Sequence, residues 1–232
     1  MINTVASIGA LLAVAELSDT EACFAACSPV IGAAAEKSAN PYCRALCDNA
    51  SHAIIALLAW HAADPTRFPS VRSDLHVYWA ERVGACACGS LVDLDHFLAV
   101  RSFSLADATH PPGGSSRRPP FHALISIMVL ALAILSMLRL VLGNRWARQR
   151  YLRVGSIICC SLFSHQLRDS TRRGFWLWPL SISTTPTSRA CYRLLLAATP
   201  LATRAILTKS AKLRKRADSE NELQVTSGPT LC

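Results

Sequence analysis

The feature that most constrains this chain is an uncharged run of 18 residues, from Phe121 to Leu138. At about 1.5 Å of rise per residue, a helix of this length spans roughly 27 Å, close to the hydrocarbon thickness of a bilayer. A surface helix of a soluble protein would show polar residues at every third or fourth position, whereas Ser126 and Ser136 are the strongly polar residues after His122. The run favours a transmembrane helix over a buried core helix.

Further apolar segments are weaker individually and form a series along the chain. They are Thr4–Ala15, Cys23–Ala35, Ala50–Ala63, Trp79–Val100, Val154–Phe163 and Ala190–Leu207. Aromatic residues stand at several of their ends, where membrane proteins place interfacial belts. The pattern predicts an all-α fold: a multi-pass transmembrane helical bundle with about six spans, five to seven being compatible with it.

The basic residues are unevenly distributed. The chain has 24 Lys and Arg against 15 Asp and Glu, a net charge of +9, while 51% of its residues are hydrophobic and 17% are charged. This composition excludes disordered and coiled-coil classes. Many of the cations lie between Arg139 and Arg153 or in the final segment, which six spans place on one side, and such a bias marks the cytoplasmic side. No basic face with a base-reading module is visible, so we expect a lipid bilayer and no nucleic acid as partner.

The end of the chain differs from the rest. Residues 209–232 combine a basic cluster with an acidic patch and lack apolar periodicity. We therefore divide the chain into a transmembrane helical domain, 1–208, and a basic tail, 209–232, which we expect to be solvated and disordered.

Four polar clusters lie at the ends of the predicted spans, although ionisable groups at membrane depth are costly. They begin even-numbered spans or end odd-numbered ones, so all four should lie at the same membrane face. The clusters are Asp48 with His52, Asp93 with Asp95 and His96, the motif RRPPFH from Arg117 to His122, and His165 with Asp169.

Imidazole and carboxylate groups together suit Zn, Mn or Fe better than Ca or Mg. We predict a divalent metal site, with Asp48 or Asp95 as general base of a hydrolase acting on a lipid-like substrate. The alternative interpretation is that the same residues form buried polar pairs in a non-enzymatic membrane protein that serves a structural or partner-binding role. The candidate metal ligands are His52, Asp93, His96, His122, His165 and Asp169.

The four motifs RALCDNASH, VDLDHFLAVRS, RRPPFH and SHQLRDSTRRGFWLWP resemble the transmembrane protein 267 family in order and spacing. That resemblance implies a multi-pass membrane protein. A more distant one is to bacterial inner-membrane proteins predicted to be metal-dependent hydrolases, which carry Asp-x-Asp-His and His-Arg-Gly-x-Thr-His motifs. Asp93, Asp95 and His96 match the first motif. Arg118 and His122 match the second, in which Arg117 and Pro119 replace a His and a Gly. The endoplasmic reticulum or another endomembrane is the expected location by default.

Overall fold

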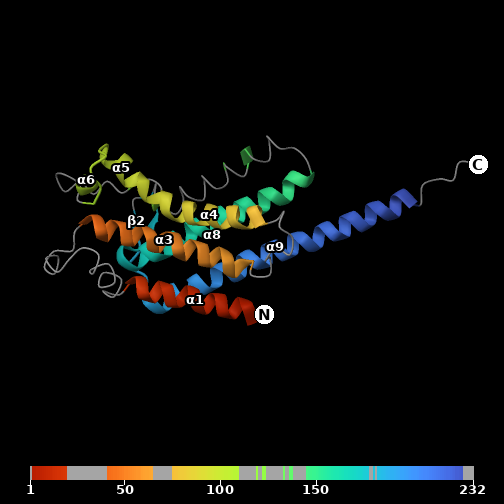
Figure 1. Cartoon of the computed structure of the whole chain (residues 1–232), viewed down its shortest axis with the longest axis horizontal. Coiled ribbons are helices and arrows are strands. Elements are labelled where there is room, and N and C mark those ends of the chain that lie inside the picture. The colour runs from red at the N-terminus through yellow and green to blue at the C-terminus, as the bar shows by residue number, and fades with distance from the viewer. Residues whose placement is uncertain are drawn as a thin grey trace, which may run out of the picture.

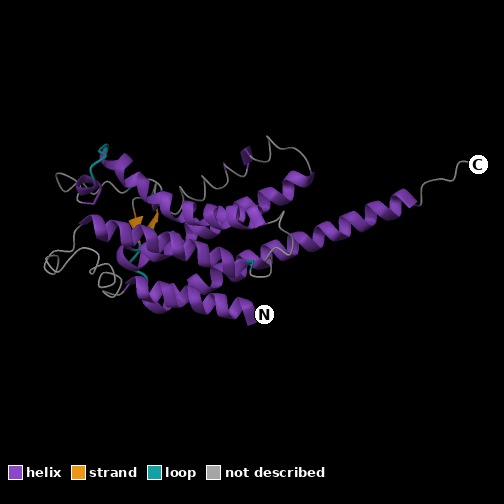
Figure 2. Ribbon diagram, viewed as in Figure 1, coloured by secondary structure: helices purple, strands orange, loops and turns teal. Residues whose placement is uncertain are grey.

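The computed structural model describes residues 2–19, 41–64, 75–109, 119, 122–123, 133, 136–137, 145–177, 180 and 182–226. Helices dominate this part of the chain (Figure 2). In chain order the elements are α1 (Ile2–Asp19), α3 (Pro41–Ala63), α4 (Leu75–Leu91), the 3₁₀ turn η3 (Val92–Leu94), α5 (Asp95–Val100), α6 (Leu105–Thr109), α8 (Arg145–Arg173), β1 (Trp176–Leu177), β2 (Ile182–Ser183) and α9 (Arg189–Thr226).

Helix α3 lies at the centre of the bundle. It packs against α1, α4, α8 and α9, while α8 also packs against α4 and α9 (Figure 1). The core between them is formed by fully buried apolar side chains, among them Leu11, Ile55, Ala59, Leu167 and Leu196. The close packing of these side chains holds the helices together, since van der Waals contact stabilises helix pairs even where the surrounding lipid is as apolar as the side chains.

The helices α3 and α9 run in one direction, and α4 and α8 run in the other (Figure 1). The start of α3, the end of α4 with η3 and α5, and the end of α8 therefore meet at one end of the bundle. We call this the imidazole end. The opposite end joins the last turn of α3 to the first turns of α4 and to α8, and we call it the arginine end.

A close approach of α3 and α4 at Gly89 brings the helices together near the imidazole end. A Cβ atom at this position would lie 2.5 Å from Ala56 Cβ and 2.9 Å from the carbonyl oxygen of His52. Only glycine fits there without a shift of one helix. Nearby, the Ser90 hydroxyl donates a hydrogen bond to the Asn49 side chain, which links α4 to α3.

The chain segment that follows α8 holds His122 in place. Helix α8 is followed directly by Gly174, whose φ of +70° is the left-handed conformation typical of the residue after a helix C-terminus. Its N–H donates to the Ser170 carbonyl at 3.0 Å. The strand β1 then pairs with β2 and also forms an isolated parallel bridge from Trp176 to Ala123. This bridge ties the residue after His122 to the end of α8.

Two helices in the described part of the chain are long and apolar enough to cross a membrane. The first is Leu75–Val100, which comprises α4, η3 and α5, and the second is Arg189–Glu220 within α9. The apolar segment of α1, Thr4–Glu16, is shorter. Most of the run from Phe121 to Leu138 and all of Cys23–Ala35 lie outside the described residues, so the number of six spans stays a prediction.

The predicted disorder of the tail is wrong over residues 209–226. Helix α9 continues without interruption to Thr226. Its last turns are rich in Lys, Arg, Ala, Leu and Glu, which favour helix without needing burial. The side chains described between Ala211 and Glu220 are exposed, so the segment is solvated as expected but helical. Residues 227–232 lie outside the described residues.

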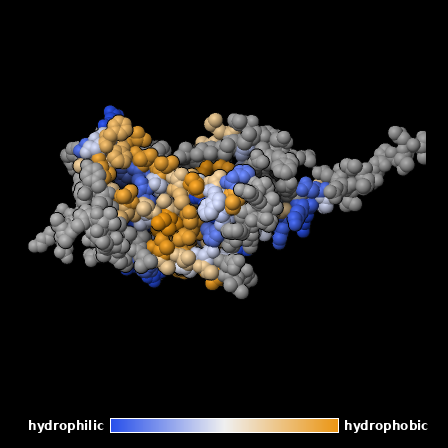
Figure 3. All heavy atoms as spheres, viewed as in Figure 1, coloured by the Kyte–Doolittle hydropathy of each residue, from blue (hydrophilic) through white to orange (hydrophobic). Residues whose placement is uncertain are grey.

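Apolar side chains lie exposed on the outer faces of the two candidate spans. Those with large exposed fractions include Trp79, Val83 and Leu98 in the first span, and Leu194 and Ile206 in the second. Figure 3 shows hydrophobic residues gathered across the middle of the visible face, and hydrophilic residues where α9 extends beyond the bundle. An exposed apolar belt of this kind is expected of a helical bundle in lipid.

Candidate metal centre

The imidazole of His122 is the hub of the imidazole end. Its Nδ1 atom lies 3.0 Å from Asp95 Oδ1 and 3.2 Å from Asp95 Oδ2. Its Nε2 atom lies 3.4 Å from Asp93 Oδ1 and 3.3 Å from Asp169 Oδ2. Three of the four clusters found in the sequence therefore meet at one ring.

A second imidazole, that of His165, points into the same space. Its Nδ1 atom donates a hydrogen bond of 2.8 Å to the Gly89 carbonyl, which can only accept. The proton therefore sits on Nδ1, and the lone pair of Nε2 is free to act as a ligand. This Nε2 lies 3.4 Å from His122 Nε2, 3.7 Å from Asp93 Oδ1 and 3.8 Å from Asp169 Oδ2.

These distances resemble the edges of a coordination tetrahedron. A zinc ion with nitrogen and oxygen ligands at about 2.0 to 2.2 Å keeps its ligand atoms roughly 3.3 to 3.6 Å apart. The separations from the two Nε2 atoms to each other and to the two carboxylate oxygens run from 3.3 to 3.8 Å. We call this group of atoms the four-ligand set; its members are Asp93 Oδ1, His122 Nε2, His165 Nε2 and Asp169 Oδ2.

Both imidazoles are oriented by a partner on their other nitrogen. The buried carboxylate of Asp95 faces His122 Nδ1, and the carbonyl of Gly89 accepts from His165 Nδ1. Metal-binding histidines commonly donate their second ring N–H to a carboxylate or a backbone carbonyl, which fixes the tautomer and raises the basicity of the ligand. The donor set and its supporting contacts thus fit a divalent transition metal.

The predicted ligands His52 and His96 flank the four-ligand set. The His52 ring stacks on His165, with centroids 3.8 Å apart, and its Nε2 lies 3.4 Å from Asp169 Oδ1. It is 1% exposed, and among the described residues neither ring nitrogen has a hydrogen-bond partner. A buried imidazole without hydrogen bonds is costly unless another ligand satisfies it. The His96 ring lies edge-on to His122, with centroids 4.6 Å apart.

The ligand atoms of all six predicted metal residues fall into three overlapping groups. Within each group, one donor atom per residue lies within 4.8 Å of the others. Any two of the groups share one residue. The groups are His52 with Asp93 and His165, Asp93 with His96 and His122, and His122 with His165 and Asp169.

The two predicted catalytic carboxylates have different surroundings. Asp95 is 1% exposed and contacts His122, which places it behind a ligand. Asp48 instead forms ion pairs with Arg168 and with Arg172, the latter at 3.0 Å. Because these two cations occupy its oxygens, the geometry favours a positioning role for Asp48.

The sequence interpretation missed two contributors to this region. One is the Gly89 carbonyl, which no motif could identify because it acts through its backbone. The other is Arg172, which bridges Asp48 and Asp169 through bonds of 3.0 and 2.8 Å. Its place three residues after Asp169 was the signal that could have revealed the pair. Arg117 and Arg118 of the motif RRPPFH lie outside the described residues.

Comparisons with known proteins agree with the motif order. The family model described as YdjM inner membrane protein matches residues 48–225. Transmembrane protein 267 of Xenopus laevis is 32% identical over 162 residues, which are 69% of this chain and 67% of that protein. The Danio rerio protein of that name is 32% identical over 157 residues, 68% of this chain and 64% of the relative.

The resemblance found in the motifs is thus confirmed, and the match covers all four clusters. The alignment with the Mus musculus relative is shorter, 32% identical over 141 residues, which are 60% of this chain and 58% of that protein. The chain therefore spans about 58 to 67% of the length of these curated relatives. No solved structure matches the chain.

Proposed function

The chain belongs to the YdjM inner membrane protein family, and from that premise we propose that it is a multi-pass membrane protein with a divalent metal centre of Zn, Mn or Fe. Asp93, His122, His165 and Asp169 would hold the ion through the four-ligand set. His52 and His96 would complete a second position beside it. The metal-dependent hydrolysis of a lipid-like substrate is the activity that such a centre supports best.

The single observation that carries this proposal is the spacing of the four-ligand set. Hydrogen-bonded pairs would approach to about 2.7 to 3.2 Å. The five separations run from 3.3 to 3.8 Å: the three from His122 Nε2 fall within the roughly 3.3 to 3.6 Å expected of ligands around one zinc ion, and the two from His165 Nε2 to the carboxylates are slightly longer. In addition, the second nitrogen of each imidazole is already bound to Asp95 or to Gly89, so the two Nε2 atoms face each other.

The bound metal would supply Lewis-acid polarisation of a phosphoryl or acyl oxygen and lower the pKa of bound water. The residues of the chain would orient the metal ligands and the substrate. Asp95 holds the His122 ring in one tautomer. Arg172, with 49% of its side chain exposed, fixes Asp169 Oδ1 and offers an outward-facing guanidinium to an anionic substrate. Asp48 anchors Arg168 and Arg172.

The membrane arrangement is part of the same proposal. The chain would cross the membrane six times, which places the imidazole end on the side opposite the basic 139–153 segment. The six spans would be α1, α3, the Leu75–Val100 segment, the run 121–138, α8 and α9. Lys and Arg favour the cytoplasmic side, so the metal centre would face the lumen of an endomembrane such as the endoplasmic reticulum. The substrate would enter at headgroup depth.

One observation favours a second candidate function, a non-enzymatic membrane protein stabilised by polar pairs. Arg168, Asp48, Arg172 and Asp169 form a continuous chain of ion pairs between α3 and α8. Such a network holds two helices together without any metal. It does not involve His122 or His165, however, and leaves unexplained why their Nε2 atoms lie beside two carboxylates.

Metal analysis of the detergent-purified full chain tests the proposal. We expect about one equivalent of Zn, Mn or Fe in the unmodified protein and less than a tenth of that in His122→Ala. The matched control is His76→Ala, because His76 is an exposed histidine of α4 outside the cluster. A chain purified without metal, or equal metal in all three proteins, would remove the metal centre and leave the structural candidate.

A further inference from the structure

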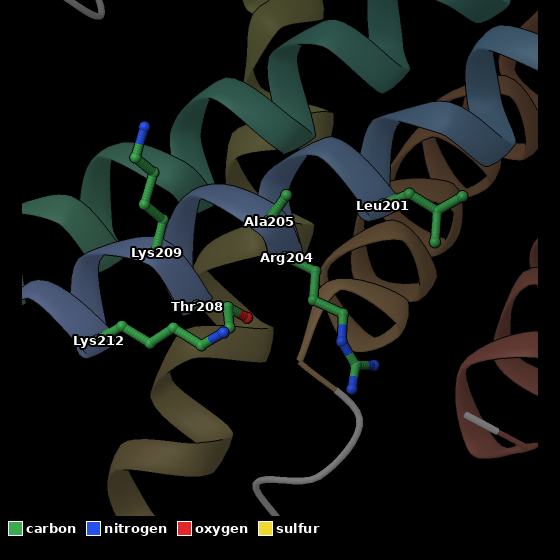
Figure 4. A pocket seen from close by; sticks show the side chains of 6 residues that line it. All are labelled: Leu201, Arg204, Ala205, Thr208, Lys209 and Lys212. Carbon is green, nitrogen blue, oxygen red and sulfur yellow. The ribbon is translucent and has the colours of Figure 1, made fainter.

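A pocket of about 440 Å³ lies on α9, remote from the metal centre. Arg204, one of its residues, donates a hydrogen bond to the Thr4 hydroxyl in the first turn of α1, which is at the arginine end of the bundle. Figure 4 shows the six lining side chains projecting from one helix. They are Leu201, Arg204, Ala205, Thr208, Lys209 and Lys212.

The lining becomes more cationic toward the end of the helix. Leu201, Arg204 and Ala205 come first, Thr208 follows, and Lys209 and Lys212 come last, so Arg204 lies between the two apolar residues. Because residues three or four apart in a helix are neighbours on its surface, these side chains form one strip. In Figure 4 the Lys212 side chain reaches beside Thr208, whereas Lys209 points away from Thr208 and Arg204.

The change in polarity falls where α9 would leave the bilayer. The apolar segment of this span ends at Leu207, and Lys212 follows five residues later, which is about 7.5 Å along a helix. The headgroup layer on each side of the hydrocarbon core is roughly 5 to 8 Å thick. Leu201 and Ala205 would therefore lie at acyl-chain depth, and both lysines would lie among the headgroups.

The charges of the pocket are uncompensated. Its lining contains three cations and no carboxylate. Lys209 and Lys212 are exposed, and within the part of the chain that the structure describes neither makes an ion pair. By contrast, Arg193, earlier in α9, is paired with Glu16 of α1 at 2.5 Å. A ligand that supplies negative charge at headgroup depth and an apolar tail below it would satisfy both ends of the strip.

We propose that this pocket binds an anionic phospholipid of the leaflet at the arginine end. Lys212 and Arg204 would contact the phosphate, Lys209 would add positive charge at the same depth, and the Thr208 hydroxyl would donate to one of the phosphate oxygens. The first acyl carbons would lie against Leu201 and Ala205. The inference rests on α9 crossing the membrane and is independent of the metal centre. Basic pockets beside membrane helices attract anionic lipids by about fivefold per lysine near the surface.

The test compares two double variants of the full chain in detergent by native mass spectrometry with added dioleoylphosphatidylglycerol. Lys209→Gln with Lys212→Gln removes two cations from the pocket. The matched control, Lys215→Gln with Arg216→Gln, removes two exposed cations of the same helix outside it. We expect the pocket variant to bind the lipid roughly 25-fold more weakly, and the control less than threefold more weakly.

Further measurements separate the ligand sources. Dioleoylphosphatidylcholine should bind at least tenfold more weakly than the anionic lipid, and sn-glycerol 3-phosphate, which lacks acyl chains, should not compete. Equal losses in the two double variants, equal binding of the zwitterionic lipid, or full competition by glycerol phosphate would each overturn the proposal. Thr208→Val provides a variant with no charge change and should weaken binding several-fold. Metal content should be the same in all these variants, so failure here is distinct from failure of the metal centre.

Discussion

The two ends of the α3, α4 and α8 bundle neutralise buried carboxylates in different ways. At the arginine end, Arg153 of α8 binds Glu81 through two bonds of 2.7 and 2.6 Å and Asp64 through one of 2.7 Å. At the imidazole end, the carboxylates of Asp93 and Asp169 face the Nε2 atoms of two histidines at 3.3 to 3.8 Å. The first end is held by direct hydrogen bonds, whereas the second combines wider separations around the two Nε2 atoms with direct bonds from Arg172 to Asp48 and Asp169.

The difference distinguishes a structural ion pair from a ligand cluster. A guanidinium is a permanent cation whose planar fork matches a carboxylate, so the arginine end is complete as it stands. An imidazole with its Nδ1–H already donated offers a lone pair and no charge, so two such rings do not neutralise Asp93 and Asp169. Arg172 pairs with Asp169 through a bond of 2.8 Å. The predictions below test this contrast, beginning with the largest expected effect.

The largest effect is expected when a ligand of the imidazole end is removed. His165→Ala should lower metal affinity by more than 100-fold, because it removes one of the four ligand atoms. Removing a residue that only supports a ligand already lowers metal affinity about 10- to 100-fold, and loss of the ligand itself should cost more. Metal content after dialysis against a competing chelator measures this. Retention of metal by the variant at the level of the unmodified chain would contradict the assignment.

Removing the cation of the arginine end should change stability and leave the metal in place. Arg153→Met leaves Asp64 and Glu81 without their partner, and we expect a loss of about 2 to 3 kcal/mol in unfolding free energy. This loss of unfolding free energy is smaller than the loss expected when a fully buried ion pair is broken, because 23% of the Arg153 side chain is exposed. Denaturant unfolding in detergent measures it. A variant as stable as the unmodified chain, or one that loses its metal while folded, would break the contrast between the ends.

A smaller effect is expected at Asp95, which contacts the Nδ1 atom of His122 and would not itself bind the metal. Asp95→Asn keeps the shape of the side chain but weakens its hold on His122 Nδ1, and metal affinity should fall 10- to 100-fold. Isothermal titration of metal-free protein measures the change. Asp107→Asn, in α6, is the control, since Asp107 bonds to Ser102 and lies outside the ligand groups. Equal affinities in the two variants would show that Asp95 does not support the site.

The smallest effect is expected at Asp48. Its carboxylate is 30% exposed and pairs with Arg168 and the half-exposed Arg172. Asp48→Asn should therefore cost at most about 1 kcal/mol of unfolding free energy and leave metal content unchanged. If the variant keeps its metal and its fold but loses all hydrolytic activity, Asp48 is the general base that the sequence predicted, and the positioning role is wrong.

The sequence could predict which residues meet at the imidazole end because helix direction alternates. Asp93, His122 and His165 are far apart in the chain, yet each lies where a predicted span begins or ends, and the alternation puts these ends together. The spacing of His165 and Asp169, one helical turn, also placed both on one face. These inferences needed only the lengths of the apolar segments and the fact that successive spans cross the membrane in opposite directions.

Other parts could not be predicted, for physical reasons. The role of Gly89 depends on its backbone carbonyl and on the close approach of α3, which no side-chain pattern encodes. The pairing of Glu81 with Arg153 depends on the register between α4 and α8. In the tail, charge and lack of apolar periodicity suggested disorder, but intrinsic helix propensity carried α9 on to Thr226.

X-ray absorption spectroscopy of the metal-loaded full chain tests the central claim most directly, because it reports the ligands of the ion themselves. For zinc, the four-ligand set predicts a first shell of nitrogen and oxygen at about 2.0 to 2.2 Å, with outer-shell scattering from two imidazoles, and a loss of one imidazole in His165→Ala. A first shell containing sulfur at about 2.3 Å, or a spectrum unchanged by that substitution, would contradict the account.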